Sequence, residues 1–263
     1  MVKQLLRELG YGYRKQSKQL ATGNYARRNE QFQIICSLVL IMSQDSPVLS
    51  IDCKKKERLG NLYRDGKCYC TKAQKVYDHD YEHLSKDKVI PHGIYDLQAN
   101  RAYVSIGNSS ETADFVKDNL LWWWFEYGIH QYPDAKSILL LCDAGGANSY
   151  RHYIFKHRLM AFAKETGLSV IVCHYPPYCS KWNPIEHRVF SQVHREMGGV
   201  IFSDHKTVQK LIEQTTTETG LTVVVRLNLK EYDIGIKIDK AELDKNRIRY
   251  HPTIPELNYR IYP

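Results

Sequence analysis

Three short apolar runs constrain the fold of this chain more than any other feature. They are VLSI within residues 46–55, SILLLC within 136–143 and SVIVC within 168–175. A short run of consecutive apolar residues, without polar alternation, is typical of a strand that is buried on both faces. The sequence therefore predicts a sheet whose two sides are covered by other elements.

Helices and one hairpin are predicted around these strands. Strand-like runs at 92–97 and 101–107 are separated by QAN, which has the length and composition of a hairpin loop. The segments with a helical pattern are 31–43, 111–128, 149–166 and 184–197. This alternation of strands and helices predicts the α/β class, with a mixed sheet flanked by helices.

The charge of the chain limits its partners. Its 263 residues include 37 Lys and Arg against 29 Asp and Glu, and the formal net charge of +8 favours a polyanionic partner such as nucleic acid. The longest apolar run, at 34–42, is shorter than a membrane-spanning helix. Seven cysteines, an odd number with no leader segment before them, are expected to be reduced thiols in a cytosol.

Three carboxylates stand where the predicted fold concentrates function. Asp52 and Asp143 each end a buried strand, and Glu186 lies in the first turn of the helix after the third buried strand. In such a sheet, functional groups gather at the carboxyl ends of the strands. Three carboxylates in one cleft repel one another unless cations lie between them, and Mg²⁺ prefers oxygen ligands. Two such ions about 4 Å apart support in-line displacement at a phosphodiester.

Each of these carboxylates also has a purely structural interpretation. Glu186 would be the reciprocal partner of Asn183 in a capping box, Asp143 would start a turn, and Asp52 would be a solvated strand end. The glycines of CDAGGANSY would instead cradle a phosphate, but the pattern lacks the lysine of a P-loop and the third glycine of a dinucleotide fingerprint. The residue pattern by itself leaves these alternatives open.

Several motifs, in the same order, resemble the ISAzo family of bacterial insertion-sequence transposases, which are distant relatives of the mariner-type elements. The resemblance extends over most of the chain from near Leu5 onward. It is carried by LLLCDAGGANSYR, GLSVIVCHYPP and SKWNPIEHRVFS, and upstream by VLSIDCKKKERLGN, VYDHDY, IPHGIYDLQANRAYVSIG and TADFVKDNLLWWW. No single motif carries it alone.

This resemblance implies a fold, a reaction and a set of ligands. The family consists of DDE transposases, whose catalytic domain resembles ribonuclease H. Its motifs imply that Asp52 of SIDCKKKE, Asp143 of CDAGG and Glu186 of WNPIEH are the catalytic residues and the metal ligands. The implied cofactor is Mg²⁺, for which Mn²⁺ substitutes, with two ions in the site. The implied partners are double-stranded DNA, as terminal inverted repeats and as target, and further copies of the chain in a transposition complex. The implied location is the bacterial cytoplasm, at the nucleoid.

Basic residues near these carboxylates in the sequence are candidate contacts to the DNA backbone. They are Lys54, Lys55, Lys56, Lys181 and Arg188. The alternative is that this run of charges is simply a solvated face.

The resemblance also predicts a division of the chain. We expect a basic linker and helix over 1–45, a ribonuclease-H-like catalytic domain over 46–200 and a small α/β extension over 201–263. Family members carry an N-terminal helix-turn-helix region that reads the terminal repeats, and Met1 lies close to the linker after that region, so the reader is expected to be missing. The alternatives to a transposase are a catalytically silent DNA-binding remnant and a ribonuclease-H-like nuclease.

Overall fold

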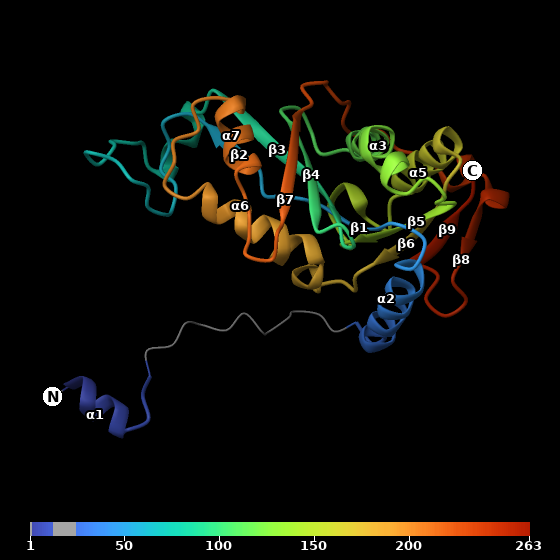
Figure 1. Cartoon of the computed structure of the whole chain (residues 1–263), viewed down its shortest axis with the longest axis horizontal. Helices are drawn as coiled ribbons and strands as arrows, with labels where there is room; N and C mark the ends of the chain where they lie inside the picture. The colour runs from blue at the N-terminus through green and yellow to red at the C-terminus, as the bar shows by residue number, and fades with distance from the viewer. Residues whose placement is uncertain (1, 13–24) are drawn as a thin grey trace.

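A nine-stranded mixed sheet forms the centre of the part of the chain that the structure, a computed structural model, describes, namely residues 2–12 and 25–263 (Figure 1). Its strand order is β7-β4-β3-β1-β5-β6-β9-β8, and β2 pairs with β3 outside this path. The strands are β1 Val48–Cys53, β2 Glu57–Leu59, β3 Asp87–Asp96, β4 Arg101–Gly107, β5 Ser137–Cys142, β6 Ser169–His174, β7 Thr222–Leu227, β8 Ile248–Tyr250 and β9 Asn258–Ile261.

The three predicted buried strands are neighbours in this sheet. They are β1, β5 and β6, and both pairs are parallel, so their carboxyl ends meet at one edge. The predicted hairpin is also confirmed, because β3 and β4 pair antiparallel around a loop at residues 97–100. The α/β class with a mixed sheet flanked by helices is therefore correct.

Helices cover both faces of the sheet. Figure 1 shows α3 and α5 on one side and α2 and α6 on the other. The longer helices are α1 Val2–Glu8, α2 Arg28–Met42, α3 Ala113–Trp123, α5 Tyr153–Thr166, α6 Ser191–Glu196 and α7 His205–Glu213. The short elements are α4 Ile129–Gln131, the 3-10 turns η1 His79–Leu84, η3 Gly146–Asn148, η4 Ser180–Trp182, η6 Lys240–Glu242 and η7 Lys245–Arg247, and the π-helical turns η2 Trp124–Gly128 and η5 Glu186–Phe190.

The core divides into layers because side chains alternate across each strand. Leu49 and Ile51 of β1 pack in the cluster formed with α3 and α5. Val48 of the same strand lies on the opposite face, in a cluster with α2. A third cluster joins β3 and β4 to η5, α6 and α7. In the part of the chain that is described, no helix is long and apolar enough to cross a membrane.

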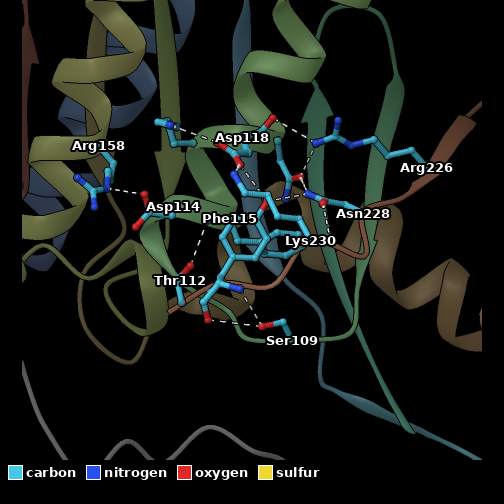
Figure 2. Close-up of polar contacts among 12 residues, drawn as sticks. Ser109, Thr112, Asp114, Phe115, Asp118, Arg158, Arg226, Asn228 and Lys230 are labelled. Atoms are coloured by element: carbon cyan, nitrogen blue, oxygen red, sulfur yellow. Dashed lines mark hydrogen bonds and ion pairs between the residues drawn. The ribbon is translucent and has the colours of Figure 1, made fainter. Parts of the chain in front are cut away.

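The C-terminal region extends the sheet at both edges. β7 pairs parallel with β4, and β9 pairs antiparallel with β6 and β8. Both β7 and the segment after it are held on α3. Arg226 of β7 donates to Asn119 at 2.8 Å, and the ammonium of Lys230, in the next segment, lies 2.7 Å from Asp118 (Figure 2). Residues 201–263 therefore share one sheet with residues 46–200, and the proposed boundary between them stays a prediction.

The described residues before β1 contain two helices of different character. All residues of α1 are exposed, whereas α2, which corresponds to the helix predicted at 31–43, packs on β5 and β6 through Ile35 and Met42. A buried pair of amides reinforces this contact, since Asn258 of β9 donates to Gln31 of α2 at 2.6 Å and Gln31 donates back at 2.8 Å. The predicted basic strap falls partly on residues 13–24, which lie outside the described residues.

Candidate active site

The register of two parallel strands brings Asp52 and Asp143 side by side. Ile51 of β1 is paired with Cys142, the last residue of β5. The residues that follow them in the chain are Asp52 and Asp143. The side chain of Asp52 is 8% exposed, and its Oδ1 accepts a hydrogen bond from the amide of Cys53 at 2.8 Å. Asp143 is half-buried and accepts a hydrogen bond from the amide of Gly145.

The helix that begins with Glu186 is anchored on β1 by two buried polar side chains. Ser50 of β1 donates a hydrogen bond to the side-chain oxygen of Asn183 and accepts one from the amide of Ile185 at 2.9 Å. The side-chain amide of Asn183 donates in turn to the carbonyl of Ile51 at 3.2 Å. Ser50 lies two residues before Asp52, so both side chains point to the same face of the sheet. This anchor places Glu186 beside Asp52.

A glycine in β3 makes room for the same helix. Gly93 is paired with Asp52, and a Cβ atom at Gly93 would lie 2.6 Å from Cδ1 of Ile185 and 3.0 Å from the ring of Phe190. These two residues are five positions apart, and the π-helical turn η5, which widens the helix, brings them to the same face. The close approach of the helix to the sheet therefore depends on the missing side chain.

The capping-box interpretation of Glu186 is wrong. The side chain of Asn183 is committed to β1, and no side chain caps the π-helical turn. The amide of Asn183, which Glu186 would have to bind, donates to the carbonyl of Ser180 at 2.8 Å. Glu186 is thus left facing the two aspartates instead of closing its own helix.

The three carboxylates interact electrostatically. Burial, followed by the charges of Asp143 and Glu186 and a hydrogen bond with Glu186, raises the pKa of Asp52 well above its ordinary value. Burial also raises the pKa of Asp143, with further contributions from Glu111 and Glu186 and an opposing one from the amide of Gly145. The surroundings of Asp52 and Asp143 therefore disfavour the ionised form of both carboxyl groups. A bound cation would stabilise that form.

The site is not a preformed metal cage. Within residues 2–12 and 25–263, no three His, Cys, Asp or Glu side chains are arranged closely enough to hold a metal ion between them. The donor set, three carboxylates at one edge of a sheet, nevertheless has the hard oxygen chemistry that suits Mg²⁺ or Mn²⁺.

Several residues around the carboxylates were not predicted from the sequence. His174 hydrogen-bonds the carbonyl of Asp143 through Nδ1 at 3.0 Å and the hydroxyl of Tyr259 through Nε2 at 3.2 Å, so Nδ1 carries the proton and donates. Ser50 and Gly93 could have been predicted from the sequence, because a polar residue or a glycine within a buried strand often marks a close contact with another segment. Nothing in the sequence distinguishes Asn183 from an ordinary helix cap.

The five basic candidates occupy different environments. Lys54 is 8% exposed and its ammonium lies 2.7 Å from Glu57, so it is not free to meet a phosphate while that pair persists. Lys55, Lys56 and Lys181 are exposed. Arg188 is exposed as well, donates to the hydroxyl of Tyr95 at 3.4 Å and lines a separate cavity of about 850 Å³ that contains none of the three carboxylates.

A polar cleft opens directly beside Asp143. It has a volume of about 420 Å³, and Asp143 lines it together with Arg151, His152, Pro176 and Pro177. The cleft lies between the loop after β5 and the loop after β6. An extended polyanion could therefore approach Asp143 past a cationic side chain.

The large mixed sheet flanked by helices has the fold of a ribonuclease-H-like transposase catalytic domain. A family model described as "Rhodopirellula transposase DDE domain" matches residues 1–263. The chain belongs to this transposase family, as its motifs predicted.

Solved structures of Mos1 transposase share the fold. A paired-end complex of Mos1 transposase with the left transposon end has a TM-score of 0.53 and 16% sequence identity, over 81% of this chain and 61% of that one. The Mos1 mariner paired-end complex with Mn has a TM-score of 0.53 and 15% identity, with 81% and 61% covered. The catalytic domain of Mos1 mariner transposase has a TM-score of 0.50 and 12% identity, over 76% of this chain and 84% of that one.

The match to Mos1 is partial in length. This chain spans about three-fifths of the Mos1 chains in the two paired-end complexes. No protein of curated function is significantly similar to it in sequence.

We predict that Gly93→Ala lowers the free energy of unfolding by about 1–3 kcal/mol, the usual cost of adding a methyl group to a tightly packed site. The new Cβ would meet Ile185 at 2.6 Å and force the helix start away from β3. Urea denaturation measures the change. Gly145→Ala is the control, because its Cβ would meet only Asp143, at an ordinary 3.6 Å. Equal unfolding midpoints for both variants would contradict the packing argument.

A second prediction concerns the raised pKa of Asp52. Because the folded protein holds a proton here that the unfolded chain releases, the stability of the metal-free protein falls as pH rises above about 4. Asp52→Asn removes this dependence, so in EDTA it should raise the thermal midpoint at pH 8 by about 2–4 °C, the shift that 1 kcal/mol produces in a chain of this size. The gain should shrink as pH falls toward 5.

Thermal unfolding at several pH values provides the measurement. The control is Asp45→Asn, an exposed aspartate just before the opposite end of β1. If Asp52→Asn were destabilising at pH 8, or its effect did not depend on pH, Asp52 would not carry the electrostatic cost assigned to it.

Proposed function

We propose that this chain is the catalytic domain of a transposase that cuts and joins DNA strands with divalent metal ions bound at Asp52, Asp143 and Glu186. The observation that carries the proposal is the convergence of these three carboxylates, from two adjacent parallel strands and a helix anchored on one of them, in a member of a transposase family. The role of each residue rests on its position and on the motif that contains it.

The ligand chemistry supports Mg²⁺, with Mn²⁺ as a substitute. Mg²⁺ usually binds through one or two carboxylates, with waters and substrate phosphates completing its shell, so a closed protein cage is not required. A Mos1 paired-end complex of the same fold contains Mn. Two bound ions would supply an activated water or hydroxyl and stabilise the departing oxygen at the phosphodiester.

The protein's own residues have positioning roles in this proposal. Ser50 and Asn183 hold the start of the Glu186 helix against β1, and His174 holds the backbone of Asp143. These buried contacts keep the carboxylates in place on rigid strands, which limits the reorganisation needed when metal and DNA bind.

The proposed substrate is double-stranded DNA, both as the ends of an insertion sequence and as the target. The net charge of +8 supports this proposal, as do the exposed Lys55, Lys56 and Lys181 near the carboxylates. Mos1 transposase assembles as a paired-end complex on transposon ends. We propose a comparable self-association for this chain, which would place it at the bacterial nucleoid.

The decisive experiment is a cleavage assay on a labelled duplex that carries a terminal repeat. With Mn²⁺ present, Glu186→Gln should reduce strand cleavage by about 100-fold or more, since even the residues that support metal ligands contribute 10–100-fold. The affinity for DNA should change little, because in this proposal Glu186 binds metal and does not contact the DNA backbone. The matched control is Glu196→Gln, at the end of α6, the helix that directly continues η5.

The outcome also separates the alternatives. Binding without cleavage by the wild-type chain would support a catalytically silent remnant and contradict the proposed activity. Cleavage of structured nucleic acid without joining of DNA ends would support a ribonuclease-H-like nuclease.

If basic side chains of this chain contact DNA phosphates, DNA binding depends on the salt concentration. We expect a dissociation constant of about 10⁻⁴ to 10⁻⁶ M at physiological salt, as in non-specific binding. The double variant Lys55→Ala/Lys56→Ala should reduce the slope of log K against log [salt] by about 2, close to one unit for each lost contact. Lys136→Ala, an exposed lysine at the opposite end of β5, should leave the slope unchanged. Fluorescence anisotropy at several salt concentrations measures the slopes, and equal slopes for all proteins would exclude this contact surface.

A further inference from the structure

A fourth carboxylate, that of Glu111, lies next to the three described above. Glu111 belongs to the loop between β4 and α3, and its side chain is half-buried. Its Oε1 accepts a hydrogen bond from the amide of Ala147 at 3.3 Å. Ala147 is part of η3, in the loop that begins with Asp143. Glu111 therefore holds the loop that carries one of the two aspartates.

Gly146 permits this contact in two ways. Its φ of +60° lies in the left-handed region, which favours glycine. A Cβ atom at this position would lie 2.7 Å from Oε1 of Glu111. Both the turn of the loop and the approach of the carboxylate thus require the residue before Ala147 to lack a side chain.

Glu111 also lies near the strand that carries the other aspartate. Its charge acts on the thiol of Cys53, the residue after Asp52, and on the carboxylate of Asp143. Glu111 is therefore close to residues on both sides of the junction between β1 and β5.

The backbone of Glu111 is fixed by the element that follows it. The hydroxyl of Thr112 caps α3 by accepting a hydrogen bond from the amide of Phe115 at 3.2 Å (Figure 2). This cap holds Glu111 at the start of a helix. Asp114, in the first turn of the same helix, is not part of the cap and forms a separate ion pair with Arg158 at 2.6 Å, also drawn in Figure 2.

We propose that Glu111 is a positioning residue that holds the loop of Asp143 in place beside β1 by accepting the hydrogen bond from the amide of Ala147. This contact, the Glu111 bridge formed by Glu111 and Ala147, acts through hydrogen-bond acceptance and not as a metal ligand. The proposal rests on the proposed function, because the separation of the aspartates matters when they bind the same metal ions and DNA.

The experiment compares two substitutions that separate shape from charge. Glu111→Gln keeps a side-chain oxygen that can accept from Ala147, whereas Glu111→Ala removes the acceptor. In the Mn²⁺-dependent cleavage assay, Glu111→Ala should raise the Mn²⁺ concentration for half-maximal cleavage by about 10–100-fold, the usual effect of losing a residue that supports a ligand, and Glu111→Gln by less than about threefold. DNA affinity should stay constant. Asp114→Asn, which removes a nearby carboxylate outside the bridge, should match the wild type.

A measurement independent of activity tests the bridge directly. Amide hydrogen exchange at Ala147 should be faster in Glu111→Ala than in the wild type, and nearly unchanged in Glu111→Gln and Asp114→Asn. Gly146→Ala reaches the same contact from the other side and should also speed exchange at Ala147, which covers the case in which Glu111→Ala does not fold.

Each outcome decides a separate claim. If Glu111→Gln lost as much metal response as Glu111→Ala, the charge would be required, and the positioning role would be overturned in favour of direct ligation. If neither variant changed metal response or exchange, the bridge itself would be overturned. If the wild-type chain failed to cleave DNA, the proposed function would fail and with it the positioning role, whereas the exchange pattern would still show whether the bridge exists.

Discussion

The parallel pairing of β1 with β5 is the constraint on which the site depends. Both strands are buried on both faces, so apolar alternation alone would not define their register. The aspartates define it, because a shift of one strand along the other would draw Asp52 or Asp143 into the apolar interior, where an unpaired carboxylate is costly. The residues that we propose as ligands thus also restrict the pairing of the central strands.

The helix of Glu186 is then placed by contacts with the same strand. Ser50 satisfies an amide at the helix start, Asn183 bonds to the backbone of β1, and Gly93 removes the side chain that would separate the helix from the sheet. Each contact is buried, so each would be costly to leave unsatisfied. The arrangement brings together carboxylates that repel one another, and the apolar clusters on both faces of the sheet offset that cost.

This balance connects stability with the proposed activity. A site that is electrostatically unfavourable without a cation is prepared to gain free energy when a cation binds. Contacts with the backbone around the carboxylates, made by His174 with the carbonyl of Asp143 and by Glu111 with the amide of Ala147, hold the geometry while the charges oppose it. The rigidity therefore comes from hydrogen bonds to the backbone, and the proposed reactivity from the carboxylates.

Local patterns in the sequence determined the individual elements, and the resemblance of its motifs to a transposase family selected the candidate triad. Continuous apolar runs identified β1, β5 and β6, the short QAN loop identified the hairpin of β3 and β4, and polar residues at the strand ends identified Asp52 and Asp143. Only the tertiary structure decided that β7 completes one edge of the sheet and the pair β9 and β8 the other, and that Asn183 binds a strand instead of capping its helix. It also decided that Lys54 is paired with Glu57 and that Glu111 meets the loop of Asp143. The physical reason is that strand and helix preferences act over neighbouring residues. The partner of a polar group, in contrast, is chosen by segments that lie far apart in the chain and meet only when the sheet has formed.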